Sequence, residues 1–161
     1  VQYSNLDFID LTVYSKPLDK NIKLKTYLQL PTHVDITQYK GIVYMFHGMI
    51  MHNGVQAYLA KEYAQLCCVV VSFDYRGHGN SEGTPGDIEG FDELKEDALK
   101  FIKLTEEYFT NKYAELTNKK EIPTFLNNKF LWGISLGGQL SIELSKTNPH
   151  HYKGVILLCP A

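Results

Sequence analysis

The segment F-L-W-G-I-S-L-G-G, from Phe130 to Gly138, decides the fold of this chain of 161 residues. Its opening apolar run is short enough to be a buried strand, and apolar residues recur at helical spacing from Gln139 to Leu144. Between the strand and the helix the chain reads G-x-S-x-G, which places Ser135 at the turn.

The G-x-S-x-G spacing has a steric basis. A serine on so sharp a turn has a strained backbone, and larger side chains at Gly133 or Gly137 would collide there. The serine hydroxyl is held above the sheet, and the N–H of Leu136 points to where an oxyanion would form. The alternative is a strand that merely ends in a turn rich in Gly and Ser, because short patterns of this kind also arise by chance.

Length and composition limit the remaining possibilities. A chain of 161 residues with 44% hydrophobic residues can bury one sizeable core, which predicts a single domain. The formal net charge of −2 and the scattered lysines argue against a nucleic-acid partner. No set of His, Asp and Glu has the spacing of metal ligands, so we expect no metal and no cofactor.

The cysteines and the apolar runs indicate a compartment. Cys67, Cys68 and Cys159 lie in or beside apolar runs, and this arrangement predicts buried, reduced thiols rather than disulfides or a metal knuckle. No basic terminus leads into an apolar block, and no apolar run approaches the roughly 20 residues of a membrane helix. We therefore expect a cytoplasmic protein that binds membranes at most peripherally.

Strand patterns divide into two kinds. Leu6 to Tyr14 and Ile22 to Leu30 alternate apolar and polar residues around a turn, which predicts an antiparallel hairpin with one solvated face. Gly41 to Phe46, Cys68 to Phe73 and Gly154 to Cys159 are apolar throughout, which is typical of buried parallel strands.

Helical patterns alternate with these strands. We expect a helix from Gly54 to about Leu66 capped by Asn53, a second from Phe91 to about Tyr108, and a third from Leu136 to about Thr147. The polar segment from Asn111 to Asn128 reads as a variable surface insertion with a frayed extension of the second helix. The alternation predicts an α/β fold, with a mostly parallel sheet, helices on both faces and an N-terminal antiparallel hairpin.

Three motifs, each at the carboxyl end of a strand, carry a family resemblance. In chain order they are H-G-M-I-M-H-N-G from His47, D-Y-R-G-H-G-N-S-E-G from Asp74, and W-G-I-S-L-G-G from Trp132. Together they resemble the α/β-hydrolase superfamily, and within it the monoacylglycerol lipase and lysophospholipase branch. The resemblance extends from about Tyr39 to Ala161, and the hairpin is compatible with it.

The resemblance implies a catalytic centre. Ser135 would be the nucleophile, and the backbone N–H groups of Met49 and Leu136 would form the oxyanion hole. The chain departs from the branch at Ile134, where histidine is usual, and at Met49 to Met51, where small residues are commoner. These departures bear on acyl or head-group preference and not on the type of reaction.

The resemblance also implies residues that shape the site, namely His47, Gly48, His52, Gly133 and Gly137. Gly48 would let the backbone turn close to the substrate. Histidines in such loops more often hydrogen-bond the loop backbone than transfer protons, and we extend that interpretation to His78. Arg76 either pins its loop through a carboxylate or faces an anionic head group, and we favour the first.

A serine nucleophile needs a base and an acid, which in this fold follow it in the order Asp or Glu, then His. After Ser135 the only candidates are Glu143, His150 and His151, on the following helix and at its far end. The resemblance places a lid after the last strand. We therefore expect residues 1–161 to be the N-terminal part of a single α/β-hydrolase domain, truncated after the sixth strand and inactive alone.

The expected function is cleavage of carboxylic esters of lipids, of the monoacylglycerol or lysophospholipid type, through an acyl-enzyme on Ser135. The expected partners are a small lipid ester, a membrane surface in transient contact, and another strand paired with the open edge at Gly154 to Cys159.

Other functions stay open at this point. A non-catalytic binding or scaffold protein on the same fold is the main alternative. A nucleotide-binding turn is a second, although Ser135 stands where a glycine would be needed. A proline aminopeptidase would want glycines after His47 and Gly48.

Overall fold

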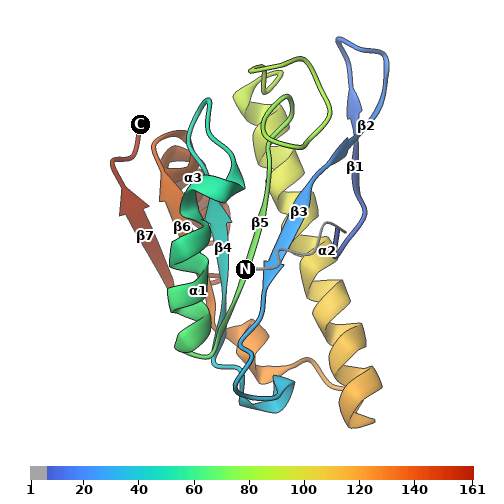
Figure 1. Ribbon diagram of the computed structural model, residues 1–161, viewed down its shortest axis with the longest axis vertical. Coiled ribbons are helices and arrows are strands. Elements are labelled where there is room, and N and C mark those ends of the chain that lie inside the picture. Colours follow the sequence, from blue (N-terminus) through green and yellow to red (C-terminus); the bar gives the residue numbers. More distant parts are fainter. Residues whose placement is uncertain (1–6) are drawn as a thin grey trace.

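A five-stranded mixed sheet organises the residues that the computed structural model describes, 7–161 (Figure 1). In spatial order its strands are β3 (Thr26–Gln29), β5 (Cys68–Phe73), β4 (Gly41–Phe46), β6 (Lys129–Ile134) and β7 (Gly154–Leu158). β3 is antiparallel to β5, and the other neighbouring pairs are parallel. Every residue of β4 is buried, as expected for a central strand that is covered on both faces.

The N-terminal hairpin is shorter than its sequence pattern. β1 (Leu11–Ser15) pairs with β2 (Lys20–Leu24) in a separate two-stranded sheet. The expected second arm, Ile22 to Leu30, was wrong as a single strand because it divides at Lys25, whose backbone N–H donates to the Ser81 hydroxyl. Its second half becomes β3 in the main sheet. The expected first arm starts at Leu6, outside the described residues.

Helices cover both faces of the sheet (Figure 1). The helices are α1 (Ala57–Gln65), α2 (Phe91–Thr117) and α3 (Leu136–Thr147), with short 3-10 turns η1 (Ile36–Gln38), η2 (Asn53–Gln56) and η3 (Thr124–Asn127). A small core under α1 includes Val43, Met45 and Trp132. The larger core, on the face of α2 and α3, includes Phe101 and Leu140.

The first helix begins later than expected. η2 replaces its first turn, and the cap is His52, whose Nδ1 accepts from the backbone N–H of Gly54 at 3.1 Å. The expectation that Asn53 is the cap was wrong, because Asn53 is buried and its amide oxygen accepts from the Ser72 hydroxyl.

The second helix, in contrast, continues past Tyr108 as regular structure. Phe109 and Tyr113 are buried and prolong its apolar face through part of the expected insertion. The helix ends at Asn118, whose φ of 60° is left-handed and whose N–H donates to the carbonyl of Ala114. Figure 1 shows this end extending beyond the strands of the sheet.

The last strand forms an open edge. β7 pairs with β6 on one side, and its residues from Val155 to Leu158 are 36 to 46% exposed.

The three cysteines are free thiols, but the expectation that they are buried was wrong, because Cys159 is exposed and the other two are half-buried. In the described part of the chain, no helix is both long enough and apolar enough to span a membrane.

Candidate active site

Ser135 occupies a strained turn between β6 and α3. Its φ of 51° and ψ of −120° fall in a sparsely populated region, which costs about 1–3 kcal/mol. The Ser135 N–H donates to the carbonyl of Leu158 on β7 at 3.1 Å. Its carbonyl accepts from the N–H groups of Gly138 at 2.8 Å and of Ala161 at 3.2 Å. The turn is therefore held from α3, from β7 and from the residues after β7.

Backbone atoms fill the space around the two glycines of the motif. A Cβ on Gly133 would lie 2.1 Å from the carbonyl oxygen of Gly137. A Cβ on Gly137 would lie 2.2 Å from the carbonyl oxygen of Phe46, at the end of β4. Neither position can accept a side chain without a backbone shift, which is the physical basis of the spacing G-x-S-x-G.

The loop after β4 runs beside the serine. A Cβ on Gly48 would lie 3.3 Å from the Ser135 Cβ. The Met51 N–H donates to the Gly48 carbonyl at 3.2 Å, which closes a tight turn. Within residues 7–161, the N–H groups of Met49 and Leu136 donate no hydrogen bond. Two unused donors thus belong to the two segments that meet at Ser135.

His47 holds this loop against the next one. The Tyr75 N–H donates to His47 Nε2 at 3.1 Å, so the ring proton is on Nδ1 and is donated to the Gly48 carbonyl at 2.8 Å. The two rings stack with centroids 3.7 Å apart, and the Tyr75 hydroxyl donates to the His47 carbonyl at 2.7 Å. Both ring nitrogens are occupied, so in this arrangement His47 positions the loop and does not act as a base.

Burial has an electrostatic consequence for His47. The imidazole is fully buried, and this lowers its pKa from 6.5 to about 4. The nearby Asp74 carboxylate opposes the shift without cancelling it. His47 is therefore neutral near pH 7, as its two hydrogen bonds require.

The loop that begins at Asp74 is fixed by two buried charged groups. The Asp74 carboxylate accepts from the backbone N–H groups of Asn53 at 2.7 Å and Asn80 at 2.9 Å. The Arg76 guanidinium makes a bidentate contact with Asp97, at 2.7 and 2.9 Å, and a third bond to Glu89. The interpretation that Arg76 pins its loop is confirmed, because protein carboxylates already occupy its donors.

The other loop histidines also bond the backbone, as expected. His52 caps η2, and His78 Nδ1 lies 2.7 Å from the carbonyl oxygen of Arg76. His78 Nε2 is buried and has no hydrogen-bond partner among the described residues. His78 and His47 have ring centroids 5.7 Å apart, so these two histidines are neighbours.

The structure brings no base to Ser135. No side chain in the described range hydrogen-bonds its hydroxyl. α3 rises about 1.5 Å per residue, so histidines after its end are roughly 18 Å away. His151 Nε2 instead lies 3.3 Å from Glu106 Oε1 and 3.1 Å from Lys129 Nζ. Across residues 7–161, no group of three or more His, Cys, Asp or Glu side chains is placed to hold a metal ion.

Sequence reasoning missed the roles of Tyr75 and Asn53. Tyr75 follows Asp74 directly in the second motif, and an aromatic residue at a strand end gives no sign of its stacking partner on another loop. Asn53 has the sequence signature of a helix cap, but its partners Ser72 and Asp74 come from a neighbouring strand end. Such contacts depend on sheet order, which periodicity does not reveal.

Comparison with known proteins supplies a family. The serine aminopeptidase family model matches residues 37–161. The chain is 29% identical over 121 residues to the monoglyceride lipase of Rattus norvegicus. The aligned region covers 75% of this chain and 35% of the relative. It is 30% identical over 125 residues to a monoglyceride lipase homolog of Monkeypox virus, and this alignment covers 78% of this chain and 40% of the homolog. The chain thus spans 35% to 40% of the length of these two relatives.

Solved structures agree on the fold. The monoacylglycerol lipase of Paleococcus ferrophilus superposes with a TM-score of 0.63 and 25% identity, over 86% of this chain and 43% of that one. A thermostable carboxyl esterase from Bacillus coagulans, in complex with glycerol, superposes with a TM-score of 0.66 and 23% identity. The match covers 95% of this chain and 44% of the esterase. The fold described above is therefore shared with these two structures.

The buried neutral His47 predicts a pH dependence of stability. The unfolded chain protonates this histidine below about pH 6.5, whereas the folded chain resists protonation down to about pH 4. The stabilisation is therefore complete above pH 6.5 and is lost as the pH falls to 4, by about 1.4 kcal/mol per unit. In urea unfolding, His47→Gln should show a correspondingly shallower loss of unfolding free energy over this window.

His33 provides the control, since it is exposed and lies far from the loop in sequence. His33→Gln should keep the full slope. An unchanged slope in His47→Gln would show that His47 is not the buried neutral group described here.

Proposed function

The chain belongs to the serine aminopeptidase family of α/β-hydrolases, in its monoacylglycerol lipase branch. We propose that it carries the nucleophile and the oxyanion hole of a serine ester hydrolase. The observation that carries the proposal is the strained turn at Ser135, directly beside the Gly48 loop, with two unused backbone donors. Gly133 and Gly137 permit that turn, and His47 and His52 fix the loop.

The proposed reaction has two halves. The Ser135 Oγ attacks the ester carbonyl carbon while a base takes the hydroxyl proton, and the N–H groups of Met49 and Leu136 stabilise the oxyanion. Collapse of the intermediate expels the alcohol, which takes the proton from the base, and leaves an acyl-enzyme on Ser135. Water then attacks the acyl-enzyme, and the carboxylic acid and free Ser135 are released.

We propose a lipid ester of the monoacylglycerol or lysophospholipid type as the substrate. Relatives named as monoglyceride lipases support this class. Met49 and Ile50, which follow Gly48 in the loop beside Ser135, are 42% and 86% exposed and offer an apolar surface for an acyl chain. The same surface suits transient contact with a membrane. Free thiols at all three cysteines favour a reducing location such as the cytoplasm.

The acid and the base would come from residues other than 7–161, in a longer form of the protein. Support comes from the Ser135 hydroxyl, which has no hydrogen-bond partner among residues 7–161, and from the greater length of the relatives. In this proposal the chain is the N-terminal part of one domain, and the open edge of β7 pairs with a further strand. Without an acid and a base, the same fold would act as a binding or scaffold protein.

Replacement of the proposed nucleophile tests the function. In a form extended to the length of the relatives, Ser135→Ala should lose hydrolysis of a monoacylglycerol by several orders of magnitude, because a nucleophile and its base act as a unit. Labelling by a fluorophosphonate should disappear as well.

Ser145→Ala is the matched control, since Ser145 lies on α3, the helix that follows Ser135, and its hydroxyl donates to the carbonyl of Ile142. This variant should keep both activity and labelling. Labelling that persisted in Ser135→Ala would assign the nucleophile to another residue.

The oxyanion loop predicts a contrast between neighbouring positions. A side chain on Gly48 would approach Met51 Sδ within 2.8 Å and crowd Ser135, so Gly48→Val should displace the Met49 donor. The expected loss in kcat is about 10²–10³-fold, as for one oxyanion donor. Met49→Leu keeps the backbone N–H and should change kcat by less than about tenfold. Equal losses in the two variants would mean that the Met49 side chain is the important part.

A further inference from the structure

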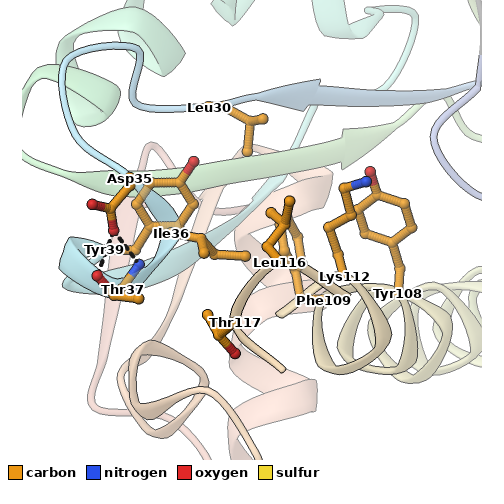
Figure 2. A pocket seen from close by; sticks show the side chains of 10 residues that line it. All are labelled: Leu30, Asp35, Ile36, Thr37, Tyr39, Tyr108, Phe109, Lys112, Leu116 and Thr117. Atoms are coloured by element: carbon orange, nitrogen blue, oxygen red, sulfur yellow. Dashed lines mark hydrogen bonds between the residues drawn. The ribbon is translucent and has the colours of Figure 1, made fainter. Parts of the chain in front are cut away.

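Figure 2 shows a cavity of the described structure that lies away from Ser135. It has a volume of about 570 Å³, and its walls include Ile36, Tyr39, Tyr108, Phe109, Lys112 and Leu116, which together define what we call the basal pocket. Tyr39 lies shortly before the amino end of β4, whereas Ser135 follows the carboxyl end of the parallel strand β6. The basal pocket therefore lies at the amino ends of the parallel strands, and Ser135 lies at their carboxyl ends.

The extension of α2 builds one wall of the basal pocket. Lys112 and Leu116 lie in the turns of the helix beyond Tyr108, and η1 supplies Ile36 on the facing side. Phe109 and Ile36 are buried and belong to the large core, so the floor is rigid and apolar. Leu116, in contrast, is 59% exposed and leaves apolar surface uncovered.

The basal pocket has two different ends. Figure 2 shows Asp35 and Thr37 on one side, Tyr108 and Lys112 on the other, and apolar side chains between them. The Asp35 carboxylate is already used, because it accepts from the backbone N–H of Thr37 at 2.9 Å and from the Thr37 hydroxyl. The acidic end therefore serves to cap η1, and the basic end is the one available to a ligand.

The groups at the basic end are easily redirected. Lys112 Nζ lies 3.1 Å from Glu115, in an exposed pair of the kind worth about 0–1 kcal/mol. The phenol of Tyr108, at the same end, has no hydrogen-bond partner within residues 7–161.

We propose that the basal pocket binds a fatty acid, with its carboxylate at Lys112 and Tyr108 and its chain over Ile36, Phe109 and Leu116. The volume falls in the range of about 300–1,000 Å³ that small-molecule sites occupy. An apolar floor with one cation and a phenol at one end matches an amphiphile with a single anionic head. The proposal does not rest on the hydrolase function, because binding at this edge needs neither Ser135 nor turnover.

Calorimetric titration of the purified chain with dodecanoate, below its micelle concentration, tests the proposal. Lys112→Met keeps the apolar stem and should weaken dodecanoate binding at least tenfold while changing dodecanol binding less than twofold. Leu116→Ser should weaken both ligands. Lys119→Met removes another exposed lysine with a carboxylate partner, Glu121, outside the basal pocket, and should change neither.

Amide chemical shifts locate the ligand. Dodecanoate should shift the resonances of Ile36 and Leu116, and shifts confined to Met49 and Ser135 would place the ligand at the other site and overturn the proposal. Absence of binding, or equal losses of dodecanoate and dodecanol in Lys112→Met, would also overturn it. Self-association that Leu116→Ser abolishes, without fatty-acid binding, would assign the basal pocket to a second copy of the chain.

Discussion

The hydrogen bonds of the Ser135 backbone are the constraint on which the rest of the site depends. A φ of 51° is unfavourable for serine, so the conformation persists only because its N–H is bonded to β7 and its carbonyl to the first turn of α3. The close approach of Gly137 to the carbonyl of Phe46 then fixes where β4 must end. One strained residue thereby sets the relative positions of three strands and a helix.

The loops after β4 and β5 are positioned relative to this turn. His47 leaves β4 beside the serine turn, and its two ring nitrogens tie the Gly48 carbonyl to the Tyr75 N–H of the following loop. Arg76 extends the connection to α2 through Asp97, in a buried pair whose partners satisfy each other. The Gly48 loop is thus positioned by buried polar contacts, whereas Met49 and Ile50 remain exposed.

The sequence predicted the parts of the fold that are local. β4, β5 and α3 have the expected bounds, because continuous apolar runs and a glycine-flanked serine mark their ends sharply. The break at Lys25 escaped prediction because alternation continues through it while the strand changes partner. The extension of α2 was hidden by its many polar surface residues, and the clamp between His47 and Tyr75 joins segments that no spacing relates. The turn at Ser135 could be predicted because its signature is local. The contacts that support it could not, because they are tertiary.

The central proposal is that residues 7–161 hold the serine and the oxyanion loop of a hydrolase, and that the base that would activate the serine lies outside them. The most direct measurement compares the rate of hydrolysis of a short p-nitrophenyl ester by residues 1–161 and by a form extended to the length of the relatives. The account predicts that the extended form is faster by at least the roughly 10²- to 10⁴-fold that a positioned base contributes. Equal rates, with residues 1–161 monomeric by sedimentation, would contradict it.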